Sequence, residues 1–263
     1  MVVTGGSRGV GAALLEVLAE LDAAHVTVLD LNTPSGPHDA FIAADLSDEQ
    51  STRGAIDAIV GDVNALFNNA GVADTSPPHV VLAVNYLAPR LLTETLLERM
   101  PDGSAVVNTA SMAGNLWRKR ADAIDELLTL DVREGWQPSL EWYDDHAGAL
   151  EQGPYNFSKE LVERWMLQLA RPLGTRGIRI NSVCPGPIDT PLLNDFRATT
   201  SDKVNDWMIR EMAGRPISPR EVAAAIAFLG SSGASYLSGL NLAIDAGFAA
   251  AAATNQIDYT GRV

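Results

Sequence analysis

The sequence predicts an α/β fold in which buried strands alternate with helices. The first observation is a short strand, a glycine-rich turn and a helix that follow directly on one another over residues 1–21. The second is that short apolar strands continue to alternate with helical patterns to the end of the chain. The third is size, because 263 residues with 46% hydrophobic content suit one large α/β domain, or two small ones, with an ample core.

Charge and cysteine content exclude several classes of partner. Lys plus Arg is 19 and Asp plus Glu is 33, so the net charge is −14 and the chain should repel nucleic acid and anionic membranes. No apolar run looks long enough to span a bilayer, and the chain opens on a strand rather than a secretory signal. The single cysteine, Cys184, permits no internal disulfide and fits a reducing cytoplasm. The four histidines are scattered, so no metal site is expected.

The stretch Thr4-Gly5-Gly6-Ser7-Arg8-Gly9-Val10-Gly11 is typical of a turn that holds a pyrophosphate. Its glycines allow close backbone approach, and the following helix, apolar at Val10, Leu14, Val17, Leu18 and Leu21, directs N–H groups at the phosphates. The next strand, 26–29, ends at Asp30, where a carboxylate would bind ribose hydroxyls and repel a 2′-phosphate. Asp30 therefore predicts NAD rather than NADP, although Arg8 could meet a 2′-phosphate.

The next two strands, 40–44 and 65–67, each end in polar or small residues. Asp45 either caps the helix expected over 47–60 or faces the adenine, and the two roles are compatible. The second strand runs into Asn68-Asn69-Ala70-Gly71, whose small residues would let the backbone pass close to a cofactor.

A long apolar helix is expected over 80–100, followed by a strand over 105–109. Pro89 has no N–H, so the carbonyl of Asn85 loses its usual partner four residues on. The freed carbonyl could hold a water, or Pro89 could simply kink the helix. Ser111 follows the strand, where a hydroxyl could bond a substrate oxygen.

Tyr155 and Lys159 lie four residues apart and so share one face of a helix expected to continue to residue 173. A free tyrosine has a pKa of roughly 10. A neighbouring ammonium favours phenolate, which would bring that pKa towards the working range for proton exchange with an alcohol or a carbonyl. The pair alone is equally compatible with an amphipathic helix that has no chemistry.

The last third supplies two more strands, at 178–183 and 240–244, and a helix at 219–229 capped by Ser218. Between them, residues 192–214 have the composition of a mobile lid over an apolar substrate. Core packing is an equal alternative for the lid's large side chains, which are Leu193, Phe196, Trp207 and Met212. The Ala-rich tail, 248–263, either crosses to a partner subunit or remains loose.

These motifs together resemble the short-chain dehydrogenases/reductases over nearly the whole chain. The resemblance rests on Thr4-Gly5-x-x-x-Gly9-x-Gly11, Asn68-Asn69-Ala70-Gly71, Tyr155-x-x-x-Lys159 and Pro185-Gly186, in that order. It implies one NAD-binding domain, 1–263, with a Rossmann-type doubly wound parallel sheet. It also implies a catalytic set of Asn85, Ser111, Tyr155 and Lys159, with a proton relay through water held at Asn85.

The resemblance implies further contacts with the cofactor and substrate. The expected cofactor contacts are Gly5, Ser7, Arg8, Gly9, Val10, Asp30, Asp45, Leu46, Asn69, Ala70, Gly71, Tyr155, Lys159, Pro185, Ile188 and Thr190. The expected substrate contacts are Met112, Trp117, Pro187, Leu193 and Met212.

A helical insertion is expected over 117–151, because the family usually has a much shorter link between the serine and the tyrosine. Its apolar residues fall into two patches, 124–130 and 136–143. The insertion resembles that of a bacterial branch similar to 3α-hydroxysteroid dehydrogenase/carbonyl reductase. That likeness implies a homodimer, with a tetramer possible, because the insertion could cover the usual tetramer interface.

The resemblance implies an NAD-dependent interconversion of a secondary alcohol and a ketone. The best candidate is a 3α-hydroxysteroid or 3-oxosteroid, or a similar bulky apolar alcohol or ketone. A terpenoid or aryl alcohol is the first alternative. A catalytically silent, nucleotide-binding or scaffolding protein is the second.

Overall fold

A seven-stranded, entirely parallel sheet organises the chain, in the order β3-β2-β1-β4-β5-β6-β7. The computed structural model describes residues 1–199 and 202–257; residues 200–201 of the expected lid and 258–263 of the expected tail lie outside that part. The strands are β1 (Val2–Thr4), β2 (Thr27–Asp30), β3 (Ala40–Ala43), β4 (Ala65–Asn68), β5 (Ala105–Thr109), β6 (Arg179–Pro185) and β7 (Asn241–Ile244). The predicted α/β fold is confirmed, with each strand within two residues of its expected bounds.

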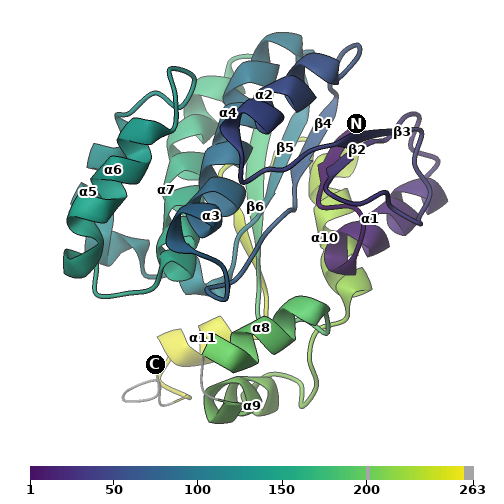
Figure 1. Cartoon of the computed structure of the whole chain (residues 1–263). Helices are drawn as coiled ribbons and strands as arrows, with labels where there is room; N and C mark the ends of the chain where they lie inside the picture. The colour runs from purple at the N-terminus through teal and green to yellow at the C-terminus, as the bar shows by residue number, and fades with distance from the viewer. Residues whose placement is uncertain (200–201, 258–263) are drawn as a thin grey trace.

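Helices cover both faces of the sheet (Figure 1). One face carries α1 (Gly9–Glu20) and α10 (Pro219–Gly230), which pack on one another. The other carries α2 (Glu49–Ala58), α4 (Ala88–Leu96) and α7 (Pro154–Gly174). The sheet thus separates two apolar cores, and the larger one, on the α7 side, includes the apolar residues of the insertion. The doubly wound order reverses between β1 and β4, and ligands of such sheets bind at that point, beyond the strand ends.

Helix caps agree with the sequence at α10 and differ at α2. Ser218 and Glu221 form a capping box at the start of α10, as the composition indicated. At α2 the cap is Asp48, whose side chain accepts the N–H of Ser51. Asp45 instead closes its own turn by accepting from Ser47, so the capping role considered for Asp45 is wrong.

The long apolar segment after β4 is broken at Asn85. It comprises α3 (Pro78–Leu82), a π-helical turn (Ala83–Leu87) and α4. In that turn the N–H of Ala88 donates to the carbonyl of Ala83, five residues back, which is the wider spacing of a π-turn. Pro89 follows and has no N–H to donate. The helix is therefore irregular around Asn85, where the sequence predicted the loss of a hydrogen bond.

The segment Pro78–Arg99 also corrects one sequence-based statement. Its 22 residues are long and apolar enough to cross a membrane by composition alone, contrary to the expectation that no such run exists. In the structure 78% of its most apolar 18-residue stretch is buried inside the protein. The segment is therefore part of the protein core.

The insertion folds into two helices that pack outside α7, as Figure 1 shows at the edge of the molecule. These are α5 (Ala121–Leu128) and α6 (Gln137–His146). Its apolar patches are buried or partly buried against the core, with Trp142 and Tyr143 stacked on Phe157 of α7. The insertion therefore shares the core of the α7 layer.

Three short helices lie beyond the carboxyl ends of the strands (Figure 1). They are α8 (Pro191–Thr199) and α9 (Asp202–Glu211) of the expected lid and α11 (Phe248–Ala253) of the tail. Trp207 packs edge-on against Phe248 at 5.5 Å between ring centroids. For Trp207 the core-packing alternative is therefore the correct one, while other lid residues face the cavity described next.

Candidate active site

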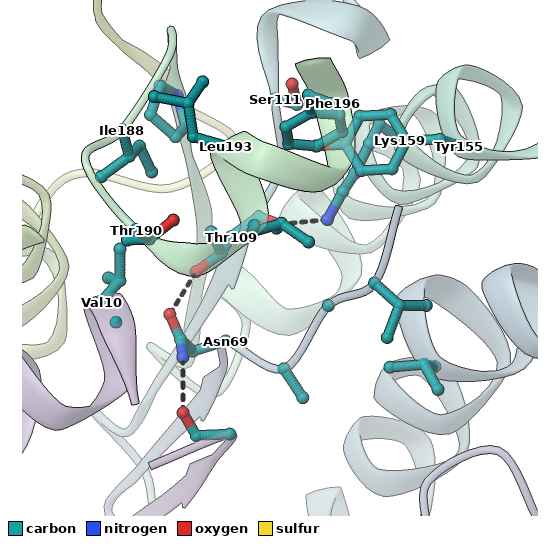
Figure 2. A pocket seen from close by; sticks show the side chains of 18 of the residues that line it. Val10, Asn69, Thr109, Ser111, Tyr155, Lys159, Ile188, Thr190, Leu193 and Phe196 are labelled. Carbon is teal, nitrogen blue, oxygen red and sulfur yellow. Dashed lines mark hydrogen bonds between the residues drawn. The ribbon is translucent and has the colours of Figure 1, made fainter. Parts of the chain in front are cut away.

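One elongated cavity of about 390 Å³ runs along the carboxyl ends of the central strands. At one end it is lined by the glycine-rich turn and the ends of β2 and β3, and at the other by α7 and the lid helix α8. Figure 2 shows Tyr155, Lys159, Ser111 and Phe196 on one side, with Val10, Ile188 and Thr190 on the other.

The glycine-rich turn is packed so tightly that only glycine fits at key positions. Gly5 has φ +71°, and an added Cβ would lie 2.7 Å from the Cα of Ala70. A Cβ at Gly11 would lie 1.8 Å from the carbonyl oxygen of Gly5. Thr4, fully buried at the end of β1, accepts the N–H groups of Asn69 and Ala70. The two motifs of the first half thus form one rigid wall of the cavity.

Asp30 joins the end of β2 to this turn. Its carboxylate accepts the N–H of Ser7 at 2.9 Å and that of Asn32 at 3.0 Å. Asp30 and the exposed Arg8 both line the cavity, whereas Ser7 does not. Ser7 contributes through its backbone, by holding the Asp30 carboxylate at the end of β2.

Tyr155, Ser111 and Lys159 meet at the far end of the cavity. Burial raises the pKa of Tyr155 to about 12, and a hydrogen bond with Ser111 opposes this rise. The Lys159 ammonium lies 5.6 Å from the Tyr155 ring centroid and donates to the carbonyl of Thr109 at 2.8 Å. Burial lowers the pKa of Lys159 to about 8. Burial therefore dominates the pKa of Tyr155 in this structure, and the lowering of that pKa by Lys159 stays a prediction for the chain with its cofactor bound.

Asn85 lies behind this cluster and is not part of the cavity lining. Its side chain bonds both backbone groups of Val72 and donates to the hydroxyl of Ser158. An added Cβ at Gly71 would lie 3.4 Å from Asn85 Oδ1 and 3.8 Å from Lys159 Nζ. Asn85 is thus one small residue away from the lysine, and its expected role in a relay stays a prediction.

The loop after β6 closes the cavity over the turn. Ile188 pairs with Ile217 in a single β-bridge. Thr190 lies against Gly9, where an added Cβ would be 3.2 Å from the threonine methyl group. Phe196 of α8 then contacts the Tyr155 ring edge-on, with 4.7 Å between centroids. The lid therefore covers the residue expected to exchange the proton.

Most of the predicted site residues line this one cavity. They are Gly5, Arg8, Gly9, Val10, Asp30, Asp45, Leu46, Asn69, Ala70, Gly71, Ser111, Met112, Tyr155, Lys159, Pro185, Pro187, Ile188, Thr190 and Leu193. Two predicted substrate contacts lie outside the lining. The buried ring of Trp117 contacts the guanidinium groups of Arg118 and Arg164, and Met212 packs against Gly186.

The cavity also contains residues that the sequence did not single out. Val204 and Met208 of α9 line it, in place of Met212. Asp74 and Asn156 add polar groups near Tyr155. The step of four residues from Val204 to Met208 could have indicated a common helix face. No local pattern identifies Asp74, because its contact is with a helix 81 residues later.

The residues present fit a nicotinamide dinucleotide. Glycines 5 and 9 both have positive φ and leave the turn open, the N-terminus of α1 follows at once, and the Asp30 carboxylate lines the same cavity at the end of β2. Within residues 1–199 and 202–257, no group of three or more His, Cys, Asp or Glu side chains is placed to hold a metal ion.

Comparison with known proteins agrees with this geometry. Residues 1–121 match the sequence profile of the family described as short chain dehydrogenase, and residues 140–249 match that described as enoyl-(acyl carrier protein) reductase. The coniferyl-alcohol dehydrogenase of Pseudomonas sp. strain HR199 is 34% identical over 250 residues, which are 95% of this chain and 96% of that protein. The cis-4-hydroxycyclohexanecarboxylate dehydrogenase of Sinomonas cyclohexanicum is 29% identical over 95% of this chain and 96% of its own length.

A solved structure with a similar sequence is the 3-alpha-hydroxysteroid dehydrogenase of Pseudomonas sp. B-0831 in complex with NADH. It is 30% identical, with a TM-score of 0.77, over 97% of this chain and 98% of that one.

Proposed function

The chain belongs to the short-chain dehydrogenases/reductases, and from that membership we propose that it interconverts a secondary alcohol and a ketone with NAD. The observation that carries the proposal is one cavity with a tyrosine, serine and lysine at one end and a dinucleotide cradle at the other. A chain of this family binds a nicotinamide cofactor and acts as an oxidoreductase on alcohols; the choice of NAD, the substrate and the roles below are proposals.

Tyr155 exchanges the proton in the proposed mechanism. In the oxidation, its phenolate takes the hydroxyl proton of the alcohol, Ser111 donates a hydrogen bond to the same oxygen, and a ketone forms. The bound nicotinamide supplies the other half of the chemistry by accepting a hydride. Lys159 stabilises the phenolate and binds the ribose hydroxyls. In the reverse direction Tyr155 returns the proton to the carbonyl oxygen.

The preference for NAD rests on Asp30. A carboxylate already held by the Ser7 N–H leaves its remaining lone pairs for ribose hydroxyls. A 2′-phosphate at the same place would meet like charge. The presence of NADH in the similar hydroxysteroid dehydrogenase structure supports the same choice.

For the substrate we favour a bulky apolar alcohol, with the 3α-hydroxyl of a steroid as the first candidate. Five large apolar side chains line the cavity beside the polar groups of Asp74 and Asn156; they are Met112, Pro187, Leu193, Phe196 and Met208. A terpenoid alcohol would contact the same apolar side chains. An aryl alcohol is the second candidate. The rings of Phe196 and Tyr155 are in edge-on contact, and the ring of an aryl substrate could make the same kind of contact with Phe196. The relative named for coniferyl alcohol supports it.

The test is NADH formation by the purified protein across 3α-hydroxysteroids, cyclic terpenols and aryl alcohols, with NAD or NADP. We expect Tyr155→Phe to lower the rate by about 10² to 10⁴, with NAD binding retained. The matched control is Tyr236→Phe, which removes the hydroxyl and keeps the ring of a tyrosine that does not line the cavity. Binding of NAD without turnover of any member of the panel would instead favour a catalytically silent protein.

We further propose a cytoplasmic homodimer that binds neither nucleic acid nor membranes. Phe228, Tyr236 and Leu237 are apolar and exposed, within ten residues at the end of α10. These side chains would be buried against a second copy, whereas α7 is covered by α5 and by Trp142 and Tyr143 of α6. Light scattering should give the dimer mass, and Tyr236→Asp should shift it towards the monomer. A tetramer would contradict the proposal.

A further inference from the structure

Asp74 stands where the loop after β4 meets the start of α7. Its Oδ1 accepts the backbone N–H of Tyr155 at 2.7 Å. The first N–H groups of a helix have no partner within the helix, and a carboxylate there also meets the positive end of the helix dipole. Asp74 therefore holds the turn of α7 from which the Tyr155 side chain projects.

Gly153 leaves the space that Asp74 occupies. An added Cβ at residue 153 would lie 2.6 Å from Asp74 Oδ2. The φ of Gly153 is −70°, which any residue can adopt, so the backbone itself makes no demand for glycine. The contact with the Asp74 carboxylate is the steric reason for a glycine here.

Asp74 also acts on Tyr155 through its charge. Its own pKa is raised by burial, against the lowering effect of the Tyr155 N–H. The other titratable groups that act on Tyr155 are Lys159 on α7 and Cys184 on β6. Tyr143 of the insertion faces Asp74 as well, and its pKa is raised, first by burial and then by that carboxylate. Asp30 and Asp45, the other cavity carboxylates, lie near the glycine-rich turn.

We propose that Asp74 is a positioning residue that fixes the first turn of α7, and that its charge moves the titration of Tyr155 to higher pH. The kinetic part of this inference rests on the proposed function. The contact between Asp74, Gly153 and Tyr155 is a property of the fold and is tested without any substrate.

The steric part is tested by a double-mutant cycle with Asp74→Ala and Gly153→Ala, measured as urea midpoints. We expect Gly153→Ala to lower the midpoint in the wild-type background and to leave it nearly unchanged once the Asp74 carboxylate is gone. Gly148→Ala is the control, because a Cβ there meets nothing within 4 Å. Equal losses from Gly153→Ala in both backgrounds would overturn the positioning role.

The charge part is tested with Asp74→Asn, which keeps an acceptor for the Tyr155 N–H. The titration of Tyr155 is read from tyrosinate absorbance just after a pH jump, as the difference from the same chain with Tyr155→Phe. Loss of the charge should move its midpoint to lower pH. The pH profile of turnover should move in the same direction.

Asp144→Asn is the control for charge, because Asp144 pairs with His79 on the surface. An unchanged Tyr155 titration in Asp74→Asn would overturn the role of the charge. Failure of the wild type to oxidise any alcohol would refute the proposed function, while the urea cycle and the absorbance titration would still decide this inference.

Discussion

The carboxylate of Asp30 is positioned before any cofactor binds, because backbone N–H groups on two sides of it hold both of its oxygens. We expect Asp30→Ser to lower the efficiency with NAD about tenfold, which corresponds to about 1.4 kcal/mol. The same change should raise the efficiency with NADP, because Arg8 then faces the 2′-phosphate alone.

Initial rates with each cofactor would measure this change, with the exposed Asp57→Ser as the control. If Asp30→Ser kept the wild-type ratio of catalytic efficiencies with NAD and NADP, Asp30 would not determine the cofactor preference.

At the scale of residues, the sequence predicted the groups that belong to local motifs and missed those that depend on packing. The spacing of Tyr155 and Lys159 predicted one shared helix face, and the family motifs around the pair assigned both residues to the site, where they line the cavity. Asp74 is joined to the site only through a tertiary contact. Trp117 was expected to contact the substrate, but its ring contacts the guanidinium groups of Arg118 and Arg164 instead. The sequence alone could not show whether the Trp117 ring points into the cavity or away from it.

At the scale of elements, the insertion is joined to α7 by a buried ion pair. Arg120 makes two hydrogen bonds to Glu160, whose side chain is fully buried. Removing one member leaves the other as an uncompensated buried charge. We expect Arg120→Met to lower the free energy of unfolding by about 3–5 kcal/mol, measured by urea unfolding.

The control for that measurement is Arg133→Met, which breaks an exposed pair with Asp131. Exposed pairs contribute about 1 kcal/mol or less. Adding Glu160→Gln to Arg120→Met should recover part of the loss, because no buried charge then remains. Equal losses for Arg120→Met and Arg133→Met would show that the buried pair does not anchor the insertion.

At the scale of the whole molecule, one buried carboxyl should make stability depend on pH. Burial raises the pKa of Glu163 from its ordinary value of 4.5 to about 7. The folded chain thus keeps a proton that the unfolded chain releases as the pH rises from about 4.5 to 7. The contribution of Glu163 to the free energy of unfolding is fully present below pH 4.5 and is lost as the pH rises through 7.

We expect Glu163→Gln to remove that loss. The difference in free energy of unfolding between pH 5 and pH 8 should become smaller than in the wild type by roughly 2–3 kcal/mol. Urea unfolding at the two pH values measures it, and the other titrating groups cancel in the comparison. An identical pH dependence in both proteins would mean that Glu163 is already ionised in the folded chain.

The central position of β1 has a consequence for the order in which the chain folds. β1 pairs with β2 on one side and with β4 on the other, so the glycine-rich turn at its end is complete only when residues up to 67 have joined the sheet. The loop with Ile188 and Thr190 follows β6, which joins β5 across more than seventy residues. Such long-range parallel pairing is slow. During synthesis, the chain should therefore complete the turn that binds the cofactor phosphates well before it completes the β6 loop that would position the nicotinamide ring.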